Sequence, residues 1–193
     1  MIDFNSSFGN QTVSKEVYIE CGIFLGATIR QAASHFNVCH GIELIPDTCR
    51  MANRQIKGEV RSHPEYNKIQ IHLGNSVEVL PKVIDPTRST TFLLDSHFTA
   101  ANKSTAETKA LTGTECPLLD ELKIITSYDW TVPHMIIVDD WRMFNADFWI
   151  EDKKRKKYCR ADWPQSEKIK MILKDYEQFS CDGNQRAVFI IGM

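Results

Sequence analysis

The fold class is decided by the stretch Val17-Tyr-Ile-Glu-Cys-Gly-Ile-Phe-Leu-Gly-Ala-Thr-Ile29. It begins as a short apolar strand, continues into a turn with Gly22 and Gly26, and ends as a helix begins. Because glycine has no side chain, a ligand can approach this turn closely and the helix can pack tightly against the strand. The helix start favours an anionic group, whereas Glu20 indicates that the ligand also carries positive charge. The turn therefore suits an amino-acid-bearing nucleotide, although such turns can also be purely architectural.

The rest of the chain alternates between strand-like and helix-like segments. Near-continuous apolar runs, such as the one over 135–138, are typical of strands that are covered on both faces. Alternation of strands and helices with such runs implies right-handed crossovers and a parallel sheet. We expect strands at Val17–Cys21, Val38–Leu44, Lys68–Leu73, Thr91–Asp95 and His134–Asp139, and helices at about Leu25–Phe36, Asp47–Gly58, Ser76–Ile84 and Pro117–Tyr128.

The C-terminal part departs from this alternation. After a helix near Gln165–Asp175, two strand-like segments, Tyr176–Cys181 and Gln185–Ile191, flank Asp182-Gly183-Asn184. Asp-Gly between two such segments predicts a β-hairpin. We therefore expect an α/β, Rossmann-like, doubly wound and mostly parallel sheet that ends in an antiparallel hairpin. Neither an internal repeat nor a shift in composition marks a boundary, so residues 1–193 are expected to form a single domain.

Composition narrows the class of protein. A net charge of −2 and a pI near 6.3 give no electrostatic case for nucleic-acid binding. Apolar runs stay well short of the roughly 20 residues that cross a bilayer, and the first residues lack the basic and apolar regions of a secretion signal. Six cysteines occur without a CxxC pair, which favours free thiols in a reducing compartment. We therefore predict a cytoplasmic protein without a membrane or nucleic-acid partner.

Acidic or amide residues follow the expected strands repeatedly. In an open parallel sheet, ligands bind outside the carboxyl ends of the strands, where the strand order reverses. A carboxylate there can accept hydrogen bonds from both ribose hydroxyls, and short polar groups can hold an adenine edge. Each residue also has a structural explanation, since Asp and Asn favour turns and helix caps. Five strand ends in succession nevertheless favour a ligand site: Glu20, Glu43, Asn75 with Ser76, Asp95, and Asp139 with Asp140.

In this order the motifs resemble those of class I S-adenosylmethionine-dependent methyltransferases, above all small enzymes associated with sugar and polysaccharide modification. The resemblance extends from Val17 to Ile191, and it implies a seven-stranded sheet with one antiparallel strand. The matching stretches are Glu20–Gly26, Gly74-Asn75-Ser76 with Leu80-Pro81, Leu94-Asp95-Ser96-His97, Cys116-Pro-Leu-Leu-Asp-Glu-Leu122 and Val138-Asp139-Asp140.

The resemblance also implies cofactor-binding roles for residues at three strand ends. Asn75 stands where the family usually has aspartate, so we expect weaker rather than absent binding of adenine. The expected cofactor residues are Glu20, Gly22, Phe24 and Gly26 around the methionine moiety, with Glu20 near its ammonium group, Glu43 at the ribose, and Asn75 with Ser76 at the adenine.

Methyl transfer from a sulfonium needs alignment of the acceptor oxygen and removal of its proton. His97 is the preferred general base, acting with Asp95, because a neutral imidazole accepts a proton near pH 7; alternatively it bonds to a loop carbonyl. Some related sugar O-methyltransferases use a magnesium ion held by aspartates, and Asp95, Asp139 and Asp140 match those positions. The expected reaction is therefore O-methylation of a sugar, glycan or other small hydroxylated acceptor, with Mg²⁺ as a candidate second cofactor.

Several interpretations stay open at this point. The segment 96–115 is the natural lid, whereas His134, at the opposite end of its strand, is expected to be structural. Alternatives to a methyltransferase are a non-catalytic S-adenosylmethionine-binding domain and a nicotinamide-dependent oxidoreductase, although Gly-x-Gly-x-x-Gly is missing. A further alternative is a metal-dependent hydrolase built on Asp95, His97, Asp139 and Asp140. A homo-oligomer is compatible with the sequence. An aromatic group could line the acceptor site or belong to the core: Trp141, Phe144, Phe148, Trp149 and Trp163.

Overall fold

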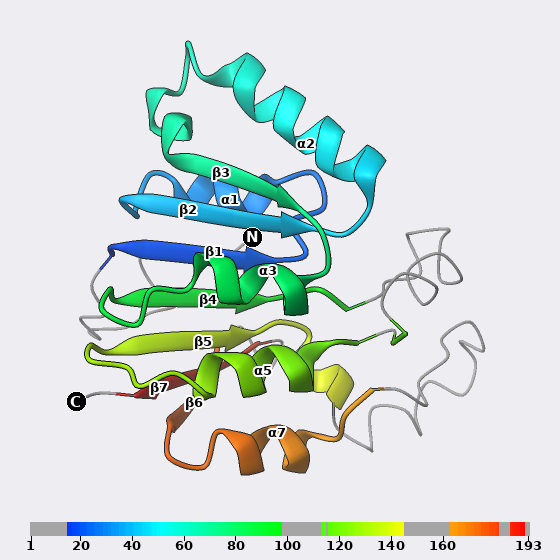
Figure 1. Ribbon diagram of the computed structural model, residues 1–193, viewed down its shortest axis with the longest axis vertical. Helices are drawn as coiled ribbons and strands as arrows, with labels where there is room; N and C mark the ends of the chain where they lie inside the picture. The colour runs from blue at the N-terminus through cyan, green and yellow to red at the C-terminus, as the bar shows by residue number, and fades with distance from the viewer. Residues whose placement is uncertain (1–14, 98–112, 115, 145–162, 182–185, 192–193) are drawn as a thin grey trace.

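A central sheet dominates the computed structural model, which describes residues 15–97, 113–114, 116–144, 163–181 and 186–191 (Figure 1). The strands are β1 (Val17–Cys21), β2 (Val38–Glu43), β3 (Ile69–Leu73), β4 (Thr90–Leu94), β5 (His134–Val138), β6 (Glu177–Cys181) and β7 (Arg186–Ile191). Seven strands pair in the order β3-β2-β1-β4-β5-β7-β6. The first five are parallel, and β7 is antiparallel to both of its neighbours. The predicted Rossmann-like, mostly parallel fold is confirmed.

Helices cover both faces of the sheet (Figure 1). On one face, Ile19 and Phe92 pack with residues of α3, α5 and α7, while on the other face Tyr18 and Leu93 pack with residues of α1 and α2. Alternate residues of a strand point to opposite faces, so two covered faces require the continuous apolar runs seen in the sequence. The helices are α1 (Ala27–Ala32), α2 (Pro46–Glu59), α3 (Ser76–Val83), α5 (Leu118–Thr126) and α7 (Ser166–Ile172), with short 3₁₀ turns η1 (Pro64–Lys68) and η2 (Trp141–Phe144).

Most predicted elements agree with the structure to within a few residues, but the first helix is shorter than expected. The prediction of Leu25–Phe36 is wrong at both ends, because α1 begins after Gly26, whose φ of 75° is left-handed. After Ala32 the amides of Ser34 and His35 bond to carbonyls three residues back, so the chain tightens into a turn. At the C-terminus the β6–β7 pairing confirms the antiparallel hairpin, while its predicted turn at 182–184 lies outside the described residues.

The cysteines that the structure describes agree with the expected free thiols. Cys21, Cys39, Cys49 and Cys116 are free and buried. Burial raises the pKa of the Cys39 and Cys116 thiols to about 12, so both stay protonated and unreactive. None of the helices in the described ranges combines the length and apolar character needed to cross a membrane.

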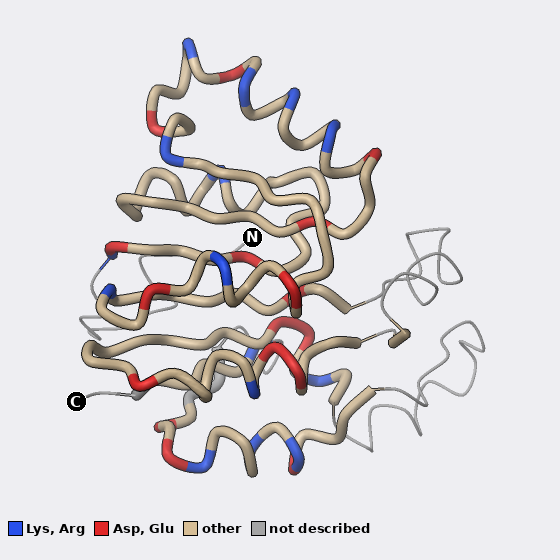
Figure 2. The backbone as a smooth tube through the Cα atoms, in the orientation of Figure 1, with Lys and Arg blue, Asp and Glu red and all other residues tan. Residues whose placement is uncertain are grey.

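The strand order fixes where a ligand can bind. From β1 the chain moves outward through β2 to β3, and it then returns to β4 on the other side of β1. The direction of winding therefore reverses between β1 and β4, and ligands of doubly wound sheets bind at the carboxyl ends there. Acidic residues lie at that edge, as seen at the ends of β2 and β5 in Figure 2.

Candidate functional site

The sheet brings the predicted site residues to one edge. Glu20 in β1 lies in register with Leu93 in β4, and Leu94 lies in register with Val138 in β5. Glu20 and the residues that follow β4 and β5, Asp95 and Asp139, therefore end adjacent strands. Each lies two residues after a residue that packs on the α1 side of the sheet: Tyr18, Leu93 and Ile137. Because side chains two positions apart in a strand point to the same face, the three acidic residues share that face.

Glu43 is held rigidly at the end of β2. The backbone amide of Phe24 donates to its Oε2 at 2.9 Å, and the amide of Ile45 donates to its Oε1 at 2.9 Å. Burial raises the pKa of this carboxyl, while the amide donors act in the opposite direction. Each oxygen keeps further acceptor capacity, so the carboxylate can still receive the two hydroxyls of a ribose.

The glycines of the β1–α1 turn serve the packing of the protein itself. Gly22 has φ 85°, and a Cβ there would lie 2.4 Å from the carbonyl oxygen of Asp95. A Cβ on Gly26 would lie 3.2 Å from Cδ1 of Ile56 in α2. At both glycines the space that a Cβ would take is thus filled by neighbouring chain segments, and their contact with a ligand stays a prediction. Phe24 between them has φ 50° and is 52% exposed, so this turn presents an aromatic residue to solvent.

Glu20 is buried beneath the turn. The Tyr18 hydroxyl donates to its Oε2 at 3.1 Å. Burial and the neighbouring Asp139 raise the pKa of Glu20 to about 8, against the lowering effect of the Tyr18 hydrogen bond. The side chain is therefore largely protonated at neutral pH, and a cation beside it would favour its ionised form. This is compatible with the expected position near an ammonium group.

The residues expected at the adenine already have partners in the protein. Asn75 caps α3, because its Oδ1 accepts a hydrogen bond from the amide of Val77 at 3.2 Å. Ser76 is buried and hydrogen-bonds with Glu121. The expected bond from the adenine amino group to the Asn75 oxygen would therefore share that oxygen with the helix cap.

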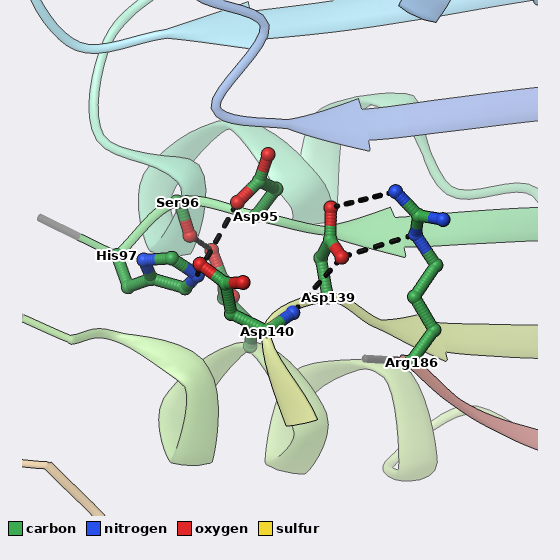
Figure 3. A network of polar contacts seen from close by, with 7 residues as sticks. Asp95, Ser96, His97, Asp139, Asp140 and Arg186 are labelled. Carbon is green, nitrogen blue, oxygen red and sulfur yellow. Dashed lines mark hydrogen bonds and ion pairs between the residues drawn. The ribbon is translucent and has the colours of Figure 1, made fainter. Parts of the chain in front are cut away.

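His97 lies between two carboxylates (Figure 3). Its Nε2 is 3.3 Å from Oδ1 of Asp95 and 3.6 Å from Oδ2 of Asp140. The imidazole packs against Trp163, with ring centroids 4.8 Å apart, and its side chain is 3% exposed, whereas that of Asp95 is 34% exposed. Burial, with Asp139 and Glu20 next in effect, raises the pKa of Asp95 well above its usual range. Of the two side chains, Asp95 is thus the one accessible to solvent, and His97 lies beneath it.

Both oxygens of Asp139 already have partners within the protein. Arg186 Nε lies 3.0 Å from its Oδ1, and Arg186 Nη2 donates to its Oδ2 at 3.5 Å. The Asp140 amide also donates to Oδ1, at 2.9 Å. Among the described residues, no group of three or more His, Cys, Asp or Glu side chains is arranged to hold a metal ion. Asp95, Asp139 and Asp140 lie close together as predicted, but as arranged they do not fit Mg²⁺.

Glu121 is a site residue that the sequence did not single out. It lies buried in the first turn of α5, where it accepts a hydrogen bond from the Ser96 hydroxyl and also bonds with Ser76 and Cys21. Burial raises its pKa. Glu121 thus hydrogen-bonds to residues at the ends of β1 and β4 and at the start of α3. The segment Cys116–Leu122 belonged to the resemblance, but nothing in its spacing indicated these contacts.

The remaining predictions concern residues around the site. Trp141, Phe144 and Trp163 are buried in the core next to α5 and α7, so these three are core residues rather than an open acceptor wall. Phe148, Trp149 and most of the expected lid, 98–112 and 115, lie outside the described residues. His134 is buried at the opposite end of β5, stacked on Trp130 and bonded to the Tyr176 hydroxyl at 2.6 Å. Its predicted structural role is confirmed.

Comparison with known proteins supports the fold. No family model matches the sequence, and no curated protein does. Among solved structures, the chain is similar to a protein from Staphylococcus aureus provisionally named a caffeoyl-CoA O-methyltransferase, with 14% identity, TM-score 0.52, and coverage of 92% of this chain and 76% of that one. A SAM-dependent methyltransferase from Aquifex aeolicus gives 11% identity, TM-score 0.51, and coverage of 92% and 81%. The chain thus has the Rossmann-like fold seen in S-adenosylmethionine-dependent methyltransferases.

A third similar structure contains a bound ligand. It is a protein from Streptococcus mutans, provisionally named a methyltransferase, in complex with SAH, with 9% identity, TM-score 0.50, and coverage of 91% of this chain and 88% of that one. At these identities the likeness concerns the fold.

Proposed function

We propose that this protein is an S-adenosylmethionine-dependent methyltransferase that acts on a hydroxyl of a sugar or other small hydroxylated acceptor. The observation that carries the proposal is Glu43, whose two oxygens are fixed by the amides of Phe24 and Ile45 beside the β1–α1 turn. A rigid carboxylate at the switch point of a doubly wound sheet is suited to a ribose diol. The similarity in fold to methyltransferases supports this function.

The chain's own residues fit such a donor, which when bound supplies an electrophilic methyl group on a sulfonium. Glu43 would accept the ribose hydroxyls, and Glu20 would face the positive charge of the amino-acid moiety. Ionised Glu20 is disfavoured without a cation and favoured with one, so the buried carboxyl is complementary to a cationic ligand. The exposed ring of Phe24 would cover the ligand from the turn.

Deprotonation of the acceptor is assigned to Asp95 and His97 acting together. Asp95 faces outward, and its raised pKa makes it a stronger base than an ordinary carboxylate. His97 lies behind it, where Asp95 and Asp140 stabilise an imidazolium. No step involves a metal, since Asp139 is engaged by Arg186.

The test is methyl transfer from labelled S-adenosylmethionine to a library of sugars, glycans and small phenols, analysed by mass spectrometry. We expect a mass increase of one methyl group on a hydroxyl oxygen, and loss of that product in Asp95→Asn. Transfer only to nitrogen or carbon acceptors would contradict the O-methylation assignment. Product formed at the wild-type rate by Asp95→Asn would contradict the role of the Asp95–His97 pair.

A donor-binding protein without turnover is the second candidate. It is favoured by the burial of His97, at 3% exposure, and by the engagement of Asn75 and Ser76 within the protein. Saturable donor binding without product across the whole acceptor library would support this alternative.

A nicotinamide-dependent oxidoreductase would instead bind a dinucleotide, which a parallel titration tests. The cytoplasmic location, the absence of a nucleic-acid partner and a homo-oligomeric state remain predictions.

A further inference from the structure

The acidic cluster, formed by Glu20, Asp95, Asp139 and Asp140, concentrates negative charge at the ends of β1, β4 and β5. Strands β4 and β5 are neighbours, and Asp95 and Asp140 lie 3.3 Å and 3.6 Å from the same nitrogen of His97. Partly buried carboxylates of like charge are costly unless a positive charge lies among them. The identity of that positive charge therefore decides what the site can bind.

Strand β7 places a positively charged side chain, Arg186, beside this cluster. It runs antiparallel to β5 with Ala187 opposite Val138, so Arg186 stands opposite Asp139 at the end of β5. Arg186 falls in the alternation of Val188 and Ile190, which face α1, and it therefore shares the face of the acidic cluster. Its side chain is 12% exposed and that of Asp139 is 18% exposed. Figure 3 shows the guanidinium directed at the Asp139 carboxylate.

The contacts use both oxygens of Asp139. Oδ1 faces Arg186 Nε at 3.0 Å and accepts the Asp140 amide at 2.9 Å, and Oδ2 accepts Arg186 Nη2 at 3.5 Å. A divalent cation bound to Asp139 would have to compete with these donors and with the positive charge of the guanidinium. The guanidinium stays charged at every physiological pH, and its fork matches a carboxylate. Its charge also reaches Asp95, whose pKa it lowers against the effects of the other acids.

We propose that Arg186 is the built-in cation of the acidic cluster, a positioning residue that holds Asp139 where a divalent metal would otherwise bind. Donor binding is therefore independent of added metal. Removal of the guanidinium leaves Asp139 without its cation, while His97 still contacts Asp95 and Asp140, and it makes the site responsive to metal. The statement about the donor rests on the proposed function, whereas the statement about metal binding does not.

The first experiment uses metal alone. Thermal unfolding of the wild-type chain and of the variants Arg186→Gln and Arg30→Gln is followed with and without millimolar Mn²⁺ or Mg²⁺. Arg30 is the matched control, because it forms a partly buried ion pair with Glu59 at 3.3 Å in a different part of the molecule. We expect a metal-induced rise in the unfolding temperature for Arg186→Gln only. A rise in the wild type that disappears in Asp139→Asn, or no rise in Arg186→Gln, would overturn the proposal.

A second variant covers the case in which Arg186→Gln does not fold. Arg186→Lys keeps the charge, and we expect it to fold and to remain indifferent to Mn²⁺. A metal-induced rise in the unfolding temperature of this variant would show that a fixed positive charge does not exclude the metal, which contradicts the proposal.

The donor is tested separately by calorimetry. For the wild type we expect the dissociation constant of S-adenosylmethionine to agree within about twofold between a chelating buffer and a magnesium buffer. Binding that is tenfold or more tighter with magnesium would overturn the built-in cation. Absence of donor binding in both buffers would contradict the proposed function and leave the result of the metal experiment standing.

Discussion

The two ends of the sheet use polar side chains differently. At the amino end of β5, buried His134 stacks on Trp130 and bonds to Tyr176, and burial lowers the pKa of His134 to about 4. The imidazole is therefore neutral and partnered, as in an ordinary core. The Ser89 hydroxyl at the same end donates to the Pro133 carbonyl at 2.9 Å. Nothing in this arrangement calls for a ligand.

At the carboxyl ends of the strands, in contrast, the backbone is strained at two residues and buried carboxyl groups lie close together. Phe24 and Asp140 have φ of 50° and 47°, and the pKa values of Glu20, Asp95 and Glu121 are all raised by burial. Such features cost stability and cluster at functional sites, where a ligand compensates for them. The contrast between the two ends supports the proposal of a ligand site at the carboxyl ends of the strands.

Replacing the two buried histidines should give the largest difference between the ends. We expect His97→Ala to lower the rate constant of methyl transfer by about 100-fold or more, the usual range for loss of acid–base catalysis. His134→Ala should lower stability by about 2 kcal/mol through lost packing and a lost hydrogen bond, with the rate constant unchanged within about threefold. Single-turnover kinetics on both variants measures this. Equal rates for His97→Ala and the wild type would remove His97 from the chemistry.

The next effect concerns backbone packing beneath the site. Gly22→Ala should destabilise the protein by about 3 kcal/mol, because its Cβ would overlap the Asp95 backbone at a left-handed φ. Gly58 in α2 is the matched control, since a Cβ there meets nothing within 4 Å. Gly58→Ala should raise stability by about 0.5–1 kcal/mol. Urea unfolding of both variants provides the measurement, and a Gly22→Ala variant as stable as the wild type would contradict the packing described.

Donor affinity should respond to Glu43 with a smaller effect. Glu43→Ala removes an acceptor for the ribose and frees the amides of Phe24 and Ile45. We expect about 2 kcal/mol weaker binding of S-adenosylmethionine, which is roughly 30-fold in the dissociation constant. Glu59→Ala removes a carboxylate from α2 away from the strand ends and should leave affinity unchanged. Unaltered calorimetric affinity in Glu43→Ala would refute the ribose assignment.

The smallest predicted effect is a dependence of stability on pH. Glu20 has a pKa of about 8 in the folded protein against a usual value of 4.5. The folded state therefore holds more protons than the unfolded state between these values, so Glu20 makes stability fall as pH rises through this window. Between pH 7 and pH 8 the loss from Glu20 is about 1 kcal/mol. Urea unfolding of Glu20→Gln should show a shallower decline than the wild type, and parallel curves would reject the shifted carboxyl.

The strands and helices were predictable from the sequence because burial on both faces of the sheet imposes continuous apolar runs. The edge that carries the candidate site was predictable because parallel strands end on the same side of a sheet. The partners at that edge were not predictable, because they depend on strand order and register. Arg186 meets Asp139 only through antiparallel pairing across 47 positions of sequence, and Glu121 reaches Ser96 from a helix on one face. A tight contact at Gly22 was predictable from the sequence, but the Asp95 backbone as the neighbouring group was not.

A crystal structure of the protein with S-adenosylhomocysteine at saturating concentration tests the central claim most directly. The account predicts electron density for the nucleoside at the carboxyl end of the sheet, with the ribose hydroxyls on Glu43 and the amino-acid moiety beside Glu20. A ligand bound elsewhere, or an unoccupied edge in a well-ordered crystal at that concentration, would contradict it.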